Sequence, residues 1–243
     1  MAQVRFSAAP TPAYRLLRFV CAGLARLLFK VELRGLETLP RTEDGRLTGG
    51  WIAAALPHRN WSEPFLLFAI LPARPRTVAV AESETVSGSP WRRMLIGAGG
   101  GVIPVGLRAK ASGFHAIVNT TKLAVDAGAV VTIFPEAGPP SQPPEFRPLS
   151  RGVAHLAART GAPVVPVVFG GSHELYLRKR IVVRVLPAVE PPRGTDRIEI
   201  ADWMAAFRER CQVLADEVHV EAQTDQPRVK LARWLTGRYP RPD

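Results

Sequence analysis

The chain has few of the features that mark secreted or integral membrane proteins. Only two cysteines occur among its 243 residues, Cys21 and Cys211, and both stand far apart in helical patterns. A disulfide framework and a zinc-ligand spacing are therefore excluded, and a reducing, cytoplasmic compartment is favoured. The N-terminus lacks the layout of a signal peptide, and no apolar run reaches the roughly 20 residues that a spanning helix needs. We expect a protein that does not cross a membrane.

The composition indicates one large core and an anionic partner. With 47% hydrophobic residues, the chain favours a single α/β domain with appendages. The net charge is +11, from 32 Lys and Arg against 21 Asp and Glu. Such a charge favours a membrane surface, a phosphorylated substrate or nucleic acid. Because the charge is diffuse and no nucleic-acid-reading motif occurs, we expect no nucleic-acid partner.

Residues 1–49 are expected to form an N-terminal amphipathic segment and a linker. The spacing predicts a helix from Tyr14 to Arg34, with the cations Arg15, Arg18, Arg26 and Lys30 opposite an apolar face. The apolar face consists of Leu17, Val20, Leu24, Leu27, Leu28 and Val31. One interpretation places this face at an anionic membrane surface, and the other packs it on the protein's own core.

From residue 50 to 223, short apolar runs alternate with helical patterns. The predicted strands are Trp51 to Leu56, Thr77 to Ala81, Gly101 to Val105, Val130 to Phe134, Val164 to Phe169 and Ile181 to Leu186. The predicted helices are Pro64 to Leu71, Pro90 to Ala98, Ser112 to Ala127, Ser150 to Thr160 and Ile200 to Glu221. This order predicts an α/β domain whose largely parallel, mixed sheet is flanked by helices, with its site at the strand ends.

Two further segments stand apart from this alternation. The proline-rich stretch from Ala137 to Pro148 predicts a stiff loop after an apolar strand, next to the site. Residues 224–243 form a basic, aromatic tail, which is interpreted either as a solvated end or as a second membrane contact.

His58 and Glu63 are the first candidates for catalysis. They follow the apolar run Trp51 to Leu56 in the stretch His58-Arg59-Asn60-Trp61-Ser62-Glu63-Pro64. An imidazole titrates near neutrality, so it can take a proton from a hydroxyl, and a nearby carboxylate can fix its tautomer. The structural alternative is that Ser62 caps a helix and Glu63 occupies its first turn.

Three more blocks follow in order: Gly101 to Arg108, Ile133 to Gly138, and Ala162 to Val168. With the His-Glu stretch, they resemble the four sequence blocks of the glycerolipid acyltransferase family, the PlsC-type group that includes lysophosphatidate acyltransferases. The resemblance runs from about His58 to Pro166. It implies an O-acyltransferase that moves a fatty acyl group from acyl-CoA or acyl carrier protein to the hydroxyl of lysophosphatidate or a related lysolipid, in phospholipid biosynthesis.

The resemblance also implies roles for individual residues. His58 is the expected base, Glu63 its orienting acid, and Arg108 the residue that holds an acceptor phosphate. Because proline stands at a position where the family has an arginine, we expect help for Arg108 from Arg59, Arg147 or Arg151. Glu136, Gly138 and Pro166 are the other expected substrate-binding residues. For Arg108 the alternative is a surface cation, for Glu136 a turn cap, and for Pro166 a residue that only shapes the backbone. No serine or cysteine nucleophile is required, because the acceptor hydroxyl attacks the thioester directly. No metal or cofactor is expected, and the enzyme is expected on the cytoplasmic face of the membrane.

Three positions depart from the family pattern. Glu63 stands where Asp is usual, Ala137 replaces a glycine, and Pro139 replaces an arginine. Since proline cannot grip a phosphate, the acceptor is alternatively a different lipid or glycolipid. Two rival hypotheses are a catalytically silent lipid-binding homologue and a serine hydrolase, the latter disfavoured because no Gly-x-Ser-x-Gly elbow occurs.

Overall fold

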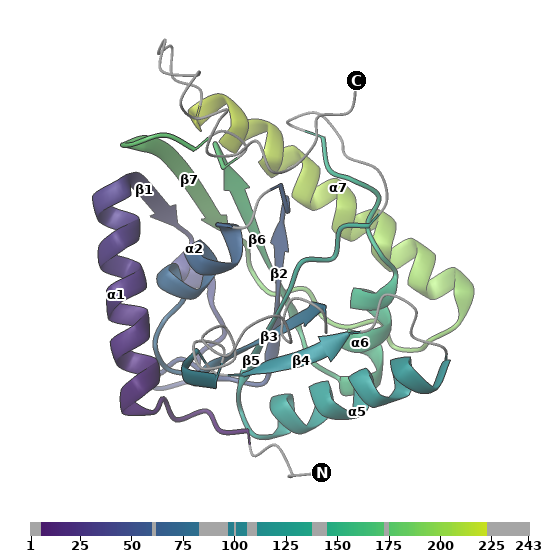
Figure 1. The fold of residues 1–243 in the computed structure, drawn as a ribbon. Coiled ribbons are helices and arrows are strands. Elements are labelled where there is room, and N and C mark those ends of the chain that lie inside the picture. Colours follow the sequence, from purple (N-terminus) through teal and green to yellow (C-terminus); the bar gives the residue numbers. More distant parts are fainter. Residues whose placement is uncertain are drawn as a thin grey trace.

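The computed structural model describes residues 6–59, 62–82, 97–99, 101–105, 111–137, 145–172 and 175–222. Seven strands form one sheet in the order β1-β7-β6-β2-β5-β3-β4 (Figure 1). The strands are β1 Phe29–Arg34, β2 Trp51–Leu56, β3 Thr77–Glu82, β4 Val102–Val105, β5 Val130–Ile133, β6 Val164–Gly170 and β7 Lys179–Val185. The helices are α1 Pro12–Leu28, η1 Leu36–Thr38, α2 Glu63–Ile70, α5 Ala111–Asp126, α6 Gly152–Thr160 and α7 Arg197–Ala222.

All neighbouring strands pair in parallel except β6 and β7, which are antiparallel. Because β7 runs antiparallel to β6, it begins at the edge of the sheet where β6 ends. This edge is the carboxyl end of the parallel strands β2, β5 and β6, the place where sites form in open α/β sheets.

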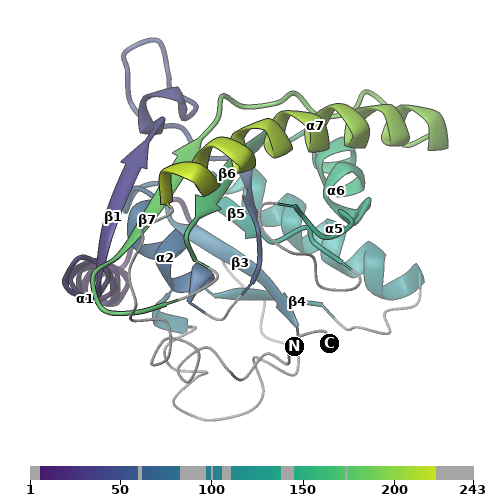
Figure 2. The same cartoon turned by 90° about the horizontal axis from the view of Figure 1, so that it is seen from above.

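Helices cover both faces of the sheet, as the alternating side chains of β2 require. Ile52, Ala54 and Leu56 enter a core shared with α5, α6 and α7. Trp51 and Ala53 enter a second core shared with α1 and α2. Figure 2 shows α7 passing alongside β6 and β7, with α1 and α2 on the other side. Every residue of β2 is buried, and full burial of a side chain such as Ile52 stabilises the fold by about 1.5–3 kcal/mol.

The predicted α/β architecture is confirmed. Each of the six predicted strands occurs, within two residues at either end. The predicted helices that correspond to α2, α5, α6 and α7 also occur, within three residues at either end. The predicted helix at 90–98 lies mostly outside the described residues, and so do the tail at 224–243 and most of the proline-rich loop.

The prediction of one helix from Tyr14 to Arg34 is wrong at its C-terminal end. Helix α1 stops at Leu28, and Phe29–Arg34 forms strand β1, which pairs in parallel with β7. The sequence carries the reason, because Phe29, Val31 and Leu33 alternate with charged residues at the period of a strand. Part of the segment 1–49 therefore belongs to the sheet.

Helix α1 buries Tyr14 and Ala25 and exposes most of its other large apolar side chains. Thr11 caps the helix, and the buried Tyr14 hydroxyl exchanges hydrogen bonds with Thr77 of β3 at 3.0 and 3.1 Å. Arg18 donates from Nε to the Leu71 carbonyl at 2.8 Å, so one predicted outer cation lies on the packed side. The outward stripe, at helical spacing, contains Leu16, Phe19, Val20, Leu24, Leu27 and Leu28. Most of the apolar face predicted for α1 therefore does not pack on the protein's own core. None of the helices in the described ranges is both long and apolar enough to cross a bilayer.

Candidate active site

Three adjacent strands bring the candidate side chains together at one edge of the sheet. Strand β2 lies between β6 and β5, and all three run in the same direction. His58 follows β2, Glu136 follows β5 and Ser172 follows β6. Residues that are far apart in the sequence therefore meet at the carboxyl end of the sheet, as predicted for an α/β fold.

His58 and Glu63 form the predicted pair. Nδ1 of His58 lies 3.0 Å from Oε2 of Glu63, and the His58 ring packs on Phe134 with ring centroids 4.4 Å apart. The His58 side chain is 37% exposed, whereas that of Glu63 is fully buried. If Nδ1 carries the proton that faces the carboxylate, Nε2 is left with a lone pair for a substrate. The arrangement suits a general base held by a buried acid.

Several donors hold the buried carboxylate of Glu63. Oε2 also accepts the backbone N–H of Arg59 at 2.6 Å, and Oε1 accepts the hydroxyl of Ser172 at 2.6 Å. An ionised carboxylate is costly to bury unless such donors surround it. Glu63 is also the first residue of α2, after Ser62 at the N-cap, where the helix dipole favours a negative charge. The structural alternative is thus only partly confirmed: Glu63 occupies the first turn of α2, but the Ser62 side chain makes no capping hydrogen bond.

Glu136 supports the backbone on the other side of His58. Its Oε2 accepts the N–H of His58 at 2.8 Å, and its Oε1 accepts the N–H of Arg147 at 3.3 Å. Burial raises the pKa of Glu136, opposed by the hydrogen bond from His58 and by the positive charges of Arg59 and Arg147. A short antiparallel bridge between Glu136 and Leu149 fixes the segment. In this arrangement the Glu136 oxygens hold two strand-end loops together.

Arg59 lies between the carboxylates of Glu63 and Glu136 and the backbone at Glu145. Its guanidinium donates to the Glu145 carbonyl, and burial lowers its pKa while the charges of Glu136 and Glu63 oppose that shift. Arginine stays protonated even so. Arg59 therefore supplies a positive charge near the carboxylates of Glu63 and Glu136.

The structure does not bring every predicted residue to this edge. Pro166 is buried inside β6, opposite Ala54 of β2, and its carbonyl accepts the N–H of Leu186 at 3.0 Å. Three residues lie between Ala54 and His58, and β2 ends at Leu56. Pro166 is therefore paired inside the sheet and not at the strand end that carries His58. Arg108 and Gly138 lie outside the described residues.

Sequence reasoning missed Ser172 and Phe134 as site residues. Ser172 is 1% exposed and follows Gly171, whose φ of +81° and contact with the Arg180 carbonyl leave no room for a side chain. The signal in the sequence was a Gly-Gly-Ser turn directly after an apolar strand. It becomes informative only when β6 is known to lie next to β2.

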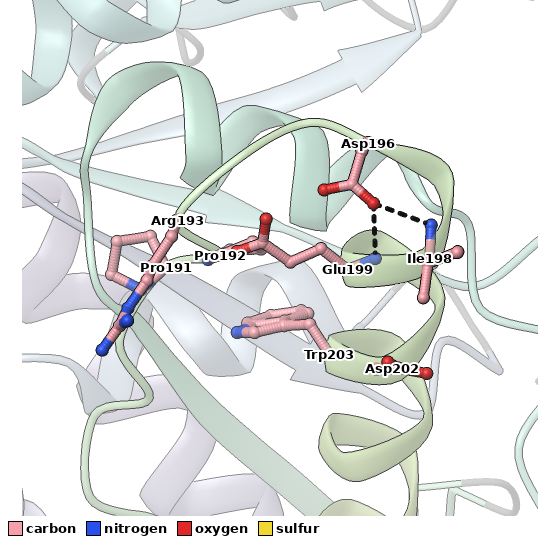
Figure 3. A pocket seen from close by; sticks show the side chains of 8 residues that line it. All are labelled: Pro191, Pro192, Arg193, Asp196, Ile198, Glu199, Asp202 and Trp203. Atoms are coloured by element: carbon pink, nitrogen blue, oxygen red, sulfur yellow. Dashed lines mark hydrogen bonds between the residues drawn. The ribbon is translucent and has the colours of Figure 1, made fainter.

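An open depression of about 560 Å³ lies elsewhere, at the start of α7. Figure 3 shows its lining, with the Trp203 ring below Glu199, and Asp196 accepting the N–H groups of Ile198 and Glu199. It contains acids but no histidine, and none of the residues around His58 line it. Among the residues with described positions, no group of His, Cys, Asp and Glu could hold a metal ion.

Comparisons with known proteins agree with this geometry. The sequence model of the Acyltransferase family matches residues 30–170, more than half of the chain. The fold is similar to the crystal structure of the 1-acyl-sn-glycerophosphate (LPA) acyltransferase, PlsC, from Thermotoga maritima. The TM-score is 0.64 at 18% identity, over 88% of this chain and 81% of that one. No curated protein matches the chain in sequence. The chain thus belongs to the Acyltransferase family, and it is an acyltransferase with the fold of the PlsC-type glycerolipid enzymes.

Proposed function

We propose that this acyltransferase moves a fatty acyl group from a thioester, acyl-CoA or acyl carrier protein, to the hydroxyl of a lysolipid in phospholipid biosynthesis. Lysophosphatidate is the first candidate acceptor. The observation that carries the proposal is the half-exposed imidazole of His58, whose Nδ1 faces the buried carboxylate of Glu63 at 3.0 Å.

The proposed reaction needs no enzyme nucleophile. Nε2 of His58 takes the proton from the acceptor hydroxyl while that oxygen attacks the thioester carbonyl carbon. Glu63 stabilises the imidazolium that forms. When the tetrahedral intermediate collapses, the C–S bond breaks with its electron pair on sulfur, and the imidazolium returns the proton to the thiolate. The products are an ester and a free thiol.

By resemblance, Arg108 and Gly138 belong to the acceptor site together with Glu136. Pro139 stands where the family has an arginine, so a related lipid or glycolipid is the second candidate acceptor.

We further propose that the protein acts as a peripheral enzyme on an anionic membrane surface, on the cytoplasmic face. Leu16 and Leu27 of α1 are each 65% exposed and Phe19 is 76% exposed, with the exposed cations Arg15 and Arg26 beside this apolar stripe. Apolar side chains flanked by cations are the composition of helices that lie at a lipid interface.

The C-terminal end of α1 lies close to the catalytic edge, which supports this orientation. The Leu28 carbonyl accepts the N–H of Arg178 at 2.5 Å, just before β7 begins, and Leu177 is 60% exposed. Since β7 starts where β6 ends, a bilayer that covers α1 and Leu177 would border the edge that holds His58.

A transfer assay tests the catalytic proposal. The purified protein is incubated with labelled acyl-CoA and acyl carrier protein against a panel of lysolipids and glycolipids, and the product is identified by mass. His58→Ala should abolish transfer while the circular dichroism spectrum stays unchanged. Full turnover by this variant would contradict the proposed mechanism. Release of free fatty acid without an acceptor would indicate a hydrolase.

Vesicle binding tests the membrane proposal separately. The double change Phe19→Ser and Leu27→Ser should weaken binding to anionic vesicles about 100-fold, because each side chain contributes about 1.5 kcal/mol or more on burial. Val213→Ser, at an exposed apolar position of α7, is the control. Equal vesicle binding by the double variant and the control would contradict the assignment of α1.

A further inference from the structure

Lys179 is a buried cation at the catalytic edge that the reaction described above does not use. It is the first residue of β7 and is 5% exposed. Because β7 is antiparallel to β6, Lys179 lies where β6 ends, close to Gly171 and Ser172. A Cβ atom built on Gly171 would be 3.3 Å from Cε of Lys179. The lysine stem therefore runs past the residue that precedes the Glu63 ligand Ser172.

The ammonium group of Lys179 lies against an aromatic ring. Its Nζ is 5.1 Å from the centroid of the Tyr176 ring, and no carboxylate of the described part of the chain forms an ion pair with it. Lysine is rarely buried to this extent unless its charge is paired. The neighbouring Arg180, by contrast, forms an ion pair with Glu32 at 2.7 Å. Within the described ranges, Lys179 therefore has an aromatic neighbour but no carboxylate in an ion pair with it.

A further basic side chain, His219 of α7, lies close to Lys179 and is also near Arg59. The last turn of α7 packs on the end of β6, where a Cβ on Gly171 would lie 3.0 Å from Cβ of Ala222. This packing brings His219 near Lys179 and Arg59. Burial and then the positive charges of Arg59 and Lys179 lower the pKa of His219, with Asp216 opposing them. Like charges gathered at one place repel one another, and a bound anion relieves that repulsion.

We propose that Lys179, with His219 close to it, binds a phosphate group of a substrate. The inference rests on the proposed function, in which coenzyme A and lysophosphatidate both carry phosphate. Lysine binds phosphate as a point charge and needs no planar, bidentate geometry. The site would also supply a cation in a chain where Pro139 replaces the arginine usual in the family.

Calorimetric titration of the full chain tests the site without any catalytic turnover. The two ligands are coenzyme A and a short-chain lysophosphatidate, titrated into the unchanged protein, Lys179→Met and Lys122→Met. Met keeps the apolar stem and removes the charge, and Lys122 is an exposed α5 lysine paired with Asp126, so its variant controls for net charge. Loss of one charged contact should weaken binding about 10-fold for Lys179→Met only.

The outcomes identify the source of the phosphate. Weaker binding of coenzyme A alone assigns the site to the donor, weaker binding of lysophosphatidate alone assigns it to the acceptor, and either result supports the proposal. Equal affinities in the two variants for both ligands would overturn it, as would an absence of binding to the unchanged protein. Because the titration needs no transfer, failure of the acyltransferase reaction leaves this result readable.

A second variant leaves Lys179 in place. His219→Glu introduces a carboxylate on the half-buried face of α7, where it competes with phosphate for the ammonium group. The same ligand should lose affinity by at least 10-fold, a loss of about 1.4 kcal/mol. Unchanged affinity in His219→Glu would contradict the proposed site even if Lys179→Met did not fold.

Discussion

Removal of the Ser172 hydroxyl tests how Glu63, the proposed orienting acid, is held in place. Ser172 donates to Oε1 of Glu63 at 2.6 Å, and both side chains are buried. A hydrogen bond to a charged group contributes about 1.5–3 kcal/mol, so Ser172→Ala should lower the free energy of unfolding by that amount. If about 1 kcal/mol of it is lost from the transition state, kcat should fall about fivefold.

A double-mutant cycle separates this effect from a general loss of packing. Denaturant unfolding and kcat are measured for Ser172→Ala, Glu63→Ala and the pair, with Ser150→Ala as a control at an exposed serine. If Ser172 acts through Glu63, its removal should change kcat little once Glu63 is absent. Ser172→Thr, which keeps a hydroxyl, should recover part of the activity. Equal and additive losses of kcat in both backgrounds would refute the reasoning.

Three further predictions concern single groups. Glu63→Asp should retain more transfer activity than Glu63→Ala but less than the unchanged enzyme. The reason is that a side chain shorter by one methylene cannot bring its carboxylate to all the present donors. Initial rates of acyl transfer by the three proteins test this prediction. Burial raises the pKa of Glu136 above its unfolded value of about 4.3, so the native state binds the proton more tightly. The stability of the unchanged protein relative to Glu136→Gln should thus be greatest below about pH 4 and fall as the pH rises through the folded pKa, as unfolding curves at several pH values would show. Burial raises the pKa of Cys211 to about 12, so a thiol reagent at pH 8 should spare Cys211 in the native protein and react with the half-buried Cys21; rapid modification of Cys211 would contradict its burial.

The sequence predicted the fold well wherever one physical signal dominated. Strands β2 and β6 are continuous apolar runs buried on both faces, and such runs are distinctive. Strand β1 was missed because its alternating pattern directly follows a strongly amphipathic helix, and a helical spacing can be extended across six residues by chance. What decides the structure there is the pairing of β1 with β7, about 150 residues away.

The candidate site likewise has one part that the local sequence predicts and one part that depends on distant pairing. His58 and Glu63 are close in the sequence, so local spacing was enough to pair them, and the 3.0 Å contact confirms that proximity. The partners of that pair could not be found by spacing, because Ser172 reaches Glu63 across 109 positions. Their meeting depends on β6 lying beside β2, which is a property of strand order.

Glu63, which stands where the family usually has Asp, depends on both local spacing and strand order. Its side chain is one methylene longer than that of Asp, so its contact with His58 needs a different backbone or rotamer. In the structure, its extra length lies in a fully buried position where one oxygen meets His58 and Arg59, and the other meets Ser172. The acid therefore links the end of β2 to the end of β6 as well as orienting the imidazole. A change at Ser172 or in the Gly-Gly turn before it should thus disturb catalysis without touching His58, which is the physical reason why the Ser172 cycle tests the site as a whole.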